Sequence, residues 1–322
     1  MVSKPPLVVI VTPTYNGGRF LRETMDSVQA QTYPNVIHLV LDNASTDQTP
    51  AILADYAKGR VPVTVVRNPE TLPQKANWNT AFGLVPAEAA YVRILCDDDT
   101  ITPDATERMV AAAEADPSIT VVGCWFECFG ETQKQKWPAD RTVFDGAEAV
   151  RMTLLSQGDL MAMQMLWRKS AVDKLQPLFG DDIRHLWDLD TVLELIMQGK
   201  YAYVHASLGF QRDHPDTVTN QLNILGTRAA TRDAVDILRK YGPATLGDDY
   251  SEAMRRFRRY YVRRILQWRR EPRAKEWLGG HYDALKRAGW TWSPFLVADA
   301  LYGWMLQRIG LAQTWTGFPG WQ

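Results

Sequence analysis

Three consecutive aspartates, Asp97, Asp98 and Asp99, follow an apolar run that ends at Leu95. Adjacent carboxylates repel one another, so three of them at the end of a strand are costly unless a cation offsets their charge. Carboxylates together with substrate phosphates are the ligands by which proteins hold Mg²⁺. The run therefore favours a divalent-metal site over its alternative, a solvated acidic turn.

Two other polar segments, residues 14–18 and 42–47, also follow apolar, β-branched runs. The strands that the pattern predicts in this half of the chain lie at residues 7–12, 36–41, 61–66 and 91–95. Helical patterns separate these runs, which is typical of βαβ units around a mostly parallel sheet. Because ligands bind beyond the carboxyl ends of such strands, where the strand order reverses, we expect the polar segments to line one site.

The rest of the chain predicts two parts. Strands are expected at residues 120–127, 161–167 and 201–208 and a helix at 189–197, and from about residue 224 the pattern is helical. Residues 223–322 carry 17 Lys and Arg against 9 Asp and Glu, whereas residues 1–222 carry 19 against 28. We therefore predict a domain at residues 1–222 and a basic, helical extension at residues 223–322.

Composition excludes several classes of protein. A hydrophobic fraction of 46% with 23% charged residues is typical of a packed globular chain rather than a disordered one. The three cysteines, Cys96, Cys124 and Cys128, are too few for a disulfide framework. Residues 7–11 are too short an apolar run for the core of a signal peptide, so we expect a cytoplasmic chain with reduced thiols.

Three motifs in order resemble those of the family 2 glycosyltransferases. They are Pro13-Thr14-Tyr15-Asn16, the segment from Asp42 to Asp47, and Cys96-Asp97-Asp98-Asp99, each at the end of a predicted strand. The resemblance covers about residues 7–220. It implies the GT-A fold, an α/β architecture with a Rossmann-like, mostly parallel sheet flanked by helices, here with a helical C-terminal extension.

The resemblance implies a role for each residue of the aspartate run. Matching on Pro103 places Asp98 at the metal-binding position and Asp97 near the donor ribose. Cys96 stands where many relatives carry the first aspartate, which leaves Asp99 as a second candidate ligand. The implied cofactor is Mn²⁺ or Mg²⁺, which would stabilise the charge of the leaving diphosphate.

The donor-binding residues that the resemblance implies are Thr12, Pro13, Thr14, Tyr15, Asp42, Asn43, Lys75, Asn79, Asp97 and Arg212. Thr14 and Tyr15 match positions that wall the base pocket. Asn43 replaces a second aspartate that accepts a hydrogen bond from the base, and its amide can still accept. We expect a UDP- or dTDP-linked donor ahead of a GDP-linked one. Asp47 is equally explained by turn chemistry, and Lys75 by a solvated surface.

The acceptor half centres on the segment from Trp187 to Leu195. The resemblance makes Asp188 the catalytic base and assigns Trp187 and Asp190 to the acceptor. A carboxylate there would remove the acceptor hydroxyl's proton in an inverting transfer. The alternative is that Asp188 caps the helix and complements its dipole. Asp181 and Asp182 are weaker candidates for the base.

Arg212 and His214 lie in a segment that resembles the closing segment of the family. His214 is a candidate metal ligand, better suited to Mn²⁺ than to Mg²⁺, with a purely structural histidine as the alternative. Arg212 could neutralise the leaving phosphates.

The extension is rich in arginine and tryptophan. Seven of the 12 tryptophans lie at or after Trp268. Eight arginines occupy one predicted helical stretch: Arg255, Arg256, Arg258, Arg259, Arg263, Arg264, Arg269 and Arg270. Such a helix suits an anionic membrane surface, and the alternative is a helical cap packed on the domain.

The resemblance implies transfer of a hexosyl or deoxyhexosyl group to a saccharide or lipid-linked acceptor in polysaccharide or glycolipid synthesis, at the inner face of the membrane. Two alternatives stay open: a nucleotidyltransferase acting on sugar phosphates, and a non-catalytic nucleic-acid-binding protein. The first would show a glycine-rich phosphate loop with basic flanks, which Gly17-Gly18 lacks. The acidic first part opposes the second, so no nucleic-acid partner is expected.

Overall fold

The structure is a computed structural model that describes residues 4–128, 131–133, 136–217, 220, 226–313 and 315. The chain divides into two compact units. The first consists of Met1–Gly146, Leu160–Asp181 and Thr191–Asp213. The second consists of Ala147–Asp159, Asp182–Asp190 and His214–Gln322. The boundary predicted near residue 222 lies outside the described residues and stays a prediction.

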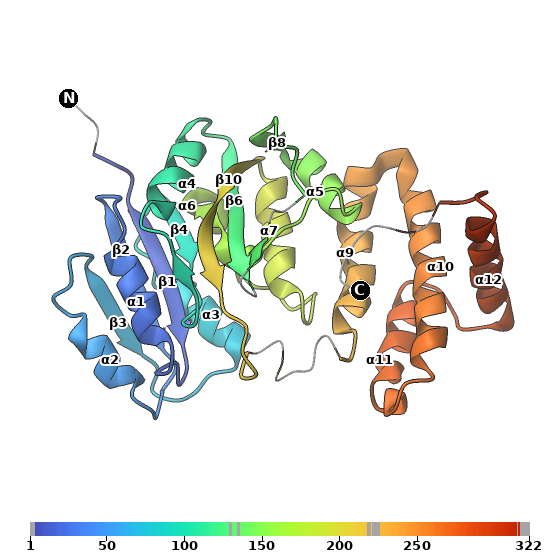
Figure 1. Ribbon diagram of the computed structural model, residues 1–322, viewed down its shortest axis with the longest axis horizontal. Helices are drawn as coiled ribbons and strands as arrows, with labels where there is room; N and C mark the ends of the chain where they lie inside the picture. The colour runs from blue at the N-terminus through green and yellow to red at the C-terminus, as the bar shows by residue number, and fades with distance from the viewer. Residues whose placement is uncertain are drawn as a thin grey trace. The chain divides into compact units, whose positions relative to one another are not determined.

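The first unit is built on one sheet with the strand order β3-β2-β1-β4-β9-β6-β10-β5 (Figure 1). Its strands are β1 (Val8–Thr14), β2 (Val36–Asp42), β3 (Val63–Arg67), β4 (Tyr91–Ile94), β5 (Thr100–Ile101), β6 (Ile119–Cys128), β9 (Leu166–Arg168) and β10 (Lys200–Gln211), with β7 (Glu131–Gln133) beside β6 and β8 (Val143–Asp145) beside β10. The α/β GT-A architecture expected from the sequence is confirmed.

Parallel pairing joins β3, β2, β1 and β4 on one side of the sheet and β6 with β10 on the other. All seven residues of β1 are buried, which explains its continuous apolar run, because helices cover both faces of such a sheet. Chain order runs outward from β1 to β3 and then returns to β4 on the far side of β1. The strand order therefore reverses between β1 and β4, where a ligand crevice is expected.

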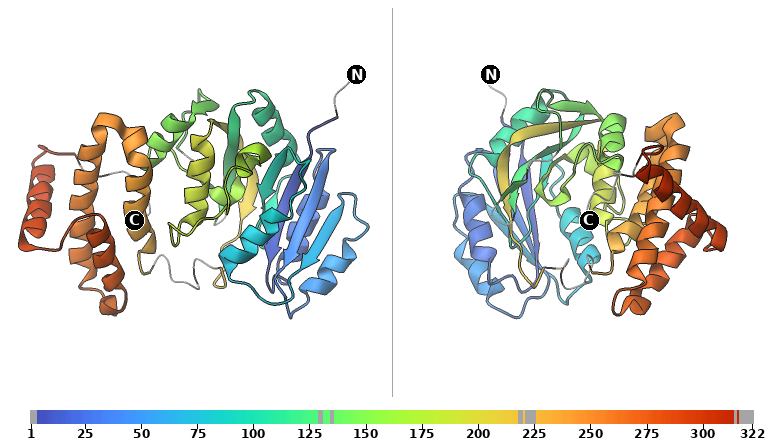
Figure 2. Two further views of the ribbon diagram at one scale, coloured as in Figure 1. Left: turned by 180° about the vertical axis from the view of Figure 1, so that it is seen from behind. Right: turned by 45° about the vertical axis from the view of Figure 1, so that its right-hand side comes forward.

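Helices flank this sheet. They are α1 (Leu21–Gln29), α2 (Thr49–Asp55), α3 (Gln74–Gly83), α4 (Ala105–Glu114), α6 (Lys169–Val172) and most of α7 (Trp187–Met197). Val8 and Ile10 pack with Val28 of α1 and Met109 of α4 in one core cluster. Helix α3 lies on the opposite face (Figure 2).

The strand predicted at residues 161–167 is wrong over its first half. A short 3₁₀ helix, Ala162–Gln164, comes first, and β9 starts only at Leu166. The ladder to β6 is limited to Leu166 and Trp167, and β9 runs antiparallel to both of its neighbours. A short antiparallel strand leaves no long alternating pattern, so the sequence could not define its limits.

The second unit is helical in its described part. Its elements are α9 (Ala229–Leu246), a 3₁₀ turn (Gly247–Asp249), α10 (Tyr250–Trp268), α11 (Ala274–Arg287) and α12 (Pro294–Arg308), and α5 (Gly146–Leu154) falls almost wholly within it. Aromatic rings fill its centre: the ring centroids of Phe257 and Tyr261 lie 5.6 Å apart, with the ring planes tilted by 31°. His281 is buried between the Tyr261 hydroxyl and the Thr227 carbonyl, and burial lowers the pKa of His281 to about 4. The predicted helical extension is confirmed.

Among the residues that the structure describes, none of the helices is long and apolar enough to cross a bilayer.

Candidate active site

The carboxyl ends of β1 and β4 meet where the strand order reverses. Thr14, the last residue of β1, donates its hydroxyl proton to Oδ2 of Asp97 at 2.5 Å. Gly17 packs so closely that a Cβ there would overlap both side chains. Burial raises the pKa of Asp97 to about 6, and the neighbouring charge of Asp98 adds to the rise. Asp97 therefore joins the two strand ends and benefits from any cation that binds beside it.

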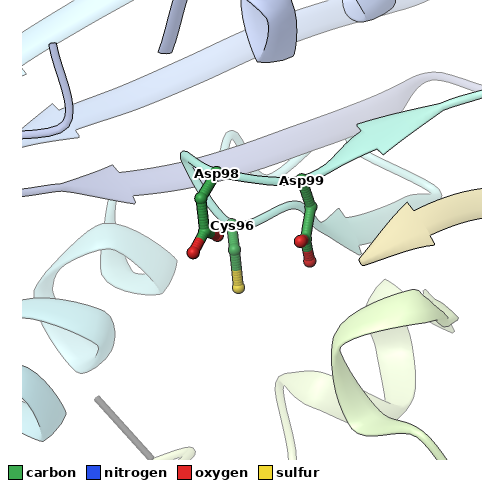
Figure 3. A group of neighbouring side chains, drawn as sticks. All are labelled: Cys96, Asp98 and Asp99. Carbon is green, nitrogen blue, oxygen red and sulfur yellow. The ribbon is translucent and has the colours of Figure 1, made fainter. Parts of the chain in front are cut away.

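The aspartate run forms the turn between β4 and β5. The Cys96 thiol and the carboxylates of Asp98 and Asp99 each place one possible ligand atom within 4.8 Å of the others. Figure 3 shows these three side chains pointing to the same side of the turn. The turn is held because β5 pairs with β10, through Ile101 with Gly209 and Thr100 with Phe210.

Asp99 is the most deeply buried member of this cluster, with 2% of its surface exposed. Its Oδ1 accepts a hydrogen bond from the backbone N–H of Arg212 at 2.9 Å, and its Oδ2 lies 3.4 Å from Nε2 of Gln164. Burial and the charge of Asp98 raise the pKa of Asp99 well above its usual value. Asp99 thus anchors the segment after β10 to the turn, in addition to offering a ligand.

Arg212 is held against the same turn. Its Nε donates to the Asp98 carbonyl at 3.0 Å, and its Nη2 pairs with Glu23 at 2.5 Å. Its guanidinium lies 4.4 Å from the centre of the Phe20 ring. The predicted donor-binding arginine therefore lies at the aspartate turn, where its charge offsets that of the carboxylates.

The cluster fits a hard divalent cation through its two carboxylates, which suit Mg²⁺ and Mn²⁺. The sulfur of Cys96 is a soft ligand and adds little affinity for either ion. Asp98 and Asp99 are therefore the residues that would hold the metal. His214 belongs to the second unit, so its place beside these ligands stays a prediction.

The turn after β2 is fixed by its own polar groups. Asp42 is buried and accepts from the Ser45 N–H at 2.9 Å and from the guanidinium of Arg67. The Asn43 carbonyl oxygen accepts from Nδ2 of Asn68 at 2.8 Å and from the backbone N–H of Leu72 at 2.9 Å. Both residues shape the loops beside β1, and contact with a base stays a prediction.

The four motif residues of β1 and the turn after it differ in exposure. Thr12 is buried and its hydroxyl lies 2.9 Å from Nε2 of His38 inside the sheet, and Pro13 is buried in the same strand. Burial lowers the pKa of His38 to about 3, so this pair is neutral. Tyr15 is 52% exposed. Of the four, Tyr15 offers the largest accessible surface to a ligand.

Lys75 and Asn79, on the first turns of α3, both hold one loop of the first unit. Lys75 donates to the Gly180 carbonyl at 2.7 Å and pairs with Asp181 at 3.0 Å. Asn79 exchanges two hydrogen bonds with the backbone of Phe179, at 2.9 and 3.0 Å. The structure gives these residues a loop-holding role that the sequence did not indicate.

The predicted acceptor residues lie at the start of α7, within the second unit. Asp188 is half-buried, and its Oδ1 accepts from the Leu189 N–H at 2.8 Å. Burial raises the pKa of Asp188 to about 6, as suits a proton acceptor near neutral pH. Asp190 is buried and paired with Lys240 at 3.0 Å, and it accepts from the Tyr241 hydroxyl at 2.7 Å. Asp190 is thus engaged by the protein in a way that Asp188 is not.

Comparison with known proteins identifies the class to which this fold and site belong. The family described as "Glycosyl transferase family 2" matches residues 9–176, which contain both the β1–β4 crevice and the aspartate turn. The chain belongs to this family. Family membership favours the glycosyltransferase interpretation over the nucleotidyltransferase and the nucleic-acid-binding protein.

One curated relative is the putative teichuronic acid biosynthesis glycosyltransferase TuaG of Bacillus subtilis, 33% identical over 110 residues. That match covers 34% of this chain and 43% of TuaG. The chain spans less than two thirds of the length of this and other curated relatives that it matches.

Two solved structures share the fold. S. aureus TarS 1–349 in complex with UDP-GlcNAc has a TM-score of 0.65 at 14% identity, over 94% of this chain and 92% of that one. The mannosyltransferase PcManGT from Pyrobaculum calidifontis in complex with GDP-Man and Mn²⁺ has a TM-score of 0.54 at 18% identity, over 96% and 84% of the two chains.

Proposed function

We propose that this chain is an inverting, metal-dependent glycosyltransferase that moves a sugar from a nucleoside-diphosphate donor to a saccharide or lipid-linked acceptor. The observation that carries the proposal is the cluster of Cys96, Asp98 and Asp99 at the strand-order reversal of a family 2 domain. A carboxylate cluster at that place suits the metal complex of a diphosphate. We expect the chain to act in polysaccharide synthesis, as the name of TuaG indicates for that relative.

The residues divide the reaction between donor and acceptor. A bound Mn²⁺ or Mg²⁺ would neutralise charge that develops on the leaving diphosphate. Asp98 and Asp99 would hold that ion, and Arg212 would add positive charge beside it. Asp188 would take the proton of the acceptor hydroxyl as its oxygen attacks the anomeric carbon on the face opposite the diphosphate. Its raised pKa of about 6 leaves it ionised at pH 7 and basic enough to act.

The comparisons leave the base of the donor nucleotide open. TarS is solved with UDP-GlcNAc and PcManGT with GDP-Man, so the fold accepts both kinds of base. We keep the uridine or thymidine donor as the proposal because Asn43 stands at the position that recognises a pyrimidine in the family. Its carbonyl oxygen accepts hydrogen bonds from Asn68 and Leu72, which fix the orientation of the side chain in the loop.

A panel of sugar nucleotides tests the proposal. The purified chain, supplied with Mn²⁺ or Mg²⁺, should hydrolyse or transfer from at least one UDP- or dTDP-linked sugar, and EDTA should abolish the turnover. NMR of the first product formed should show the anomeric configuration opposite to that of the donor. Turnover unchanged by EDTA would refute metal dependence, and a retained configuration would refute inversion.

We also propose that the second unit binds an anionic membrane surface, through α12 rather than through the arginines of α10. Four of the six arginines of α10 are held in ion pairs within the unit: Arg258 and Arg259 pair with Asp299, and Arg255 and Arg256 pair with Glu252. The exposed large apolar residues on or just beyond α12 are Phe295, Leu301, Tyr302, Trp304, Met305, Ile309 and Leu311.

The charges of α12 favour a lipid surface as the partner. Its one acidic residue, Asp299, is half-buried in the ion pairs with α10. Its one basic residue, Arg308, is exposed and lies 5.2 Å from the ring centre of Trp304, as in a side chain that reaches headgroups from an apolar base. Exposed apolar and aromatic residues with an arginine among them favour the interface of an anionic bilayer.

Co-sedimentation with vesicles tests the membrane proposal. We expect the full chain to pellet with phosphatidylglycerol-containing vesicles, and the double variant Trp304→Glu/Met305→Glu to stay in the supernatant. Arg255→Glu, an exposed change on α10, is the matched charge control and should reduce pelleting only slightly. If the double variant pellets like the wild type, α12 is not the membrane contact.

A further inference from the structure

Helix α9 forms hydrogen bonds with the chain on both sides of Asp188. Before Asp188, the carboxylate of Asp233 accepts hydrogen bonds from the backbone N–H groups of His185 at 2.5 Å and Leu186 at 3.0 Å. After it, Lys240 and Tyr241 bind the side chain of Asp190 at 2.7–3.0 Å, and Tyr241 also donates to the Asp190 carbonyl at 2.9 Å. All of these residues lie in the second unit.

The residues of α9 that form these hydrogen bonds lie on one face of the helix. Positions 233, 237, 240 and 241 are separated by four, three and one residues, the spacing of a single helical stripe. Ile237, between the two polar anchors, is fully buried. The stripe therefore joins an acceptor for backbone N–H groups at one end to donors for a carboxylate at the other, with an apolar contact between them.

Asp233 holds the two residues that lead into α7. His185 and Leu186 directly precede Trp187, the first residue of the helix, so the carboxylate fixes the direction in which the chain enters α7, and its negative charge lies near the helix N-terminus, where it complements the dipole. Here the carboxylate comes from a different helix, 47 residues further along the chain from Leu186. With 5% of its surface exposed, Asp233 makes these bonds away from water, where their loss would be costly.

We propose that Asp233 is a positioning residue for transfer, and that α9 sets the orientation of the Asp188 carboxylate by anchoring the chain on both sides of it. The inference rests on the proposed role of Asp188 as base. It makes α9, which lies in the C-terminal extension, part of the catalytic machinery. A base displaced by about 1 Å loses roughly 100-fold in rate, so the anchors need only a small movement to matter.

Electrostatics supports the same arrangement. After burial, which has the largest effect, the negative charge of Asp233 contributes to the raised pKa of Asp188. Removing that charge while the anchor is kept should lower the pKa of Asp188. The acid limb of the rate profile would then move to lower pH.

Three variants separate positioning from stability. Asp233→Ala removes the acceptor for both N–H groups, whereas Asp233→Asn keeps an acceptor oxygen and removes only the charge. Asp236→Ala is the matched control, because Asp236 is on the same helix and pairs instead with Arg287 of α11 at 2.8 Å. Each variant is measured as the full chain, with water as acceptor and the sugar nucleotide that the wild type turns over fastest.

We expect Asp233→Ala to lower kcat about 100-fold, with donor affinity in the presence of Mn²⁺ unchanged. Asp233→Asn should keep kcat within about threefold at its optimum, with the acid limb at lower pH, because one acceptor oxygen can serve both N–H groups. Asp236→Ala should behave like the wild type. A wild-type kcat in a folded Asp233→Ala chain would overturn the proposal.

Should Asp233→Ala fail to fold, Tyr241→Phe and Asp233→Asn test the proposal. Tyr241→Phe removes the hydroxyl that binds Asp190 and should lower kcat about tenfold without changing donor affinity. An unchanged kcat in Tyr241→Phe, together with an unshifted acid limb in Asp233→Asn, would overturn the proposal. Asp188→Asn is measured in parallel. If Asp188→Asn turns over normally, the proposed base is wrong. If Asp188→Asn loses turnover and the α9 variants keep it, only the positioning role is wrong.

Discussion

The aspartate turn of the first unit and the start of α7 in the second each carry two aspartates that differ in environment. At the turn, Asp99 is buried and bound by the backbone of Arg212, while Asp98 is half-buried in the ligand cluster. At α7, Asp190 is buried and bound by Lys240 and Tyr241, while Asp188 is half-buried with a raised pKa. In each region one carboxylate is buried and bound by a distant part of the chain, and its neighbour is more exposed.

The two regions differ in where their anchors come from. The turn is held by β5 and by the end of β10, elements of the same sheet. The start of α7 is held by α9, which belongs to a part of the chain that the family match does not cover. The turn is therefore held within the sheet of the family domain, whereas the proposed base depends on a helix beyond the residues that match the family.

The largest expected effect is at Asp98. Asp98→Ala should abolish metal-dependent donor binding, because it removes a carboxylate that would ligate the ion and offset its charge. Calorimetric titration of donor with Mn²⁺ measures this. Asp104→Ala is the control, since Asp104 lies outside the cluster and pairs with Arg108 at 3.5 Å. Undiminished donor affinity in Asp98→Ala would show that the aspartate turn is not part of the donor site.

The two aspartates of α7 should separate in stability. Asp190→Ala should lower the free energy of unfolding by roughly 2 kcal/mol, because it leaves Lys240 and Tyr241 without their partner. Asp188→Ala should leave stability unchanged or raise it. The folded pKa of Asp188 lies above the ordinary value, so ionised Asp188 opposes folding at pH 7. Urea unfolding of both variants measures the two free energies. Equal losses of stability would show that the two aspartates do not differ in their structural role.

The rate should depend on pH through Asp188. A general base must be ionised, and the pKa of Asp188 is about 6. Turnover at saturating donor should therefore be near its maximum at pH 7 and fall about tenfold for each pH unit well below 6. A profile that is flat down to pH 5 would exclude Asp188 as the base.

The smallest effect concerns Gly17. An added Cβ there would overlap Asp97 and Thr14, so Gly17→Ala should weaken donor binding about fivefold, equivalent to about 1 kcal/mol of steric cost. Gly83→Ala, where a Cβ meets nothing within 4 Å, is the matched control. Equal affinities in the two variants would show that the contact between the strand ends does not matter for the donor.

The sequence predicted the crevice well because its determinants are local. Buried strands such as β1 and β4 have continuous apolar runs, and polar residues directly after them must lie at one edge of the sheet. It could not predict partners that come from distant segments, such as Arg67 for Asp42 or Glu23 for Arg212. No spacing along the chain encodes these pairs.

The contacts of α9 with the start of α7 could not be predicted from the sequence for the same reason. Asp233, Lys240 and Tyr241 have the ordinary appearance of an amphipathic helix, and only the fold brings them to the start of α7. The antiparallel strand β5 was missed, and β9 was predicted with the wrong start, because two or three residues carry no periodicity. Short elements and long-range pairs are set by tertiary packing rather than by local pattern.

Donor affinity and transfer in Asp188→Asn test the role of Asp188 as base, because the amide keeps the shape of the side chain but cannot take a proton. We expect a dissociation constant for donor with Mn²⁺ equal to that of the wild type, and transfer reduced by about 10²–10⁴. Wild-type transfer in Asp188→Asn, together with its loss in Asp190→Asn, would reverse the roles of the two carboxylates.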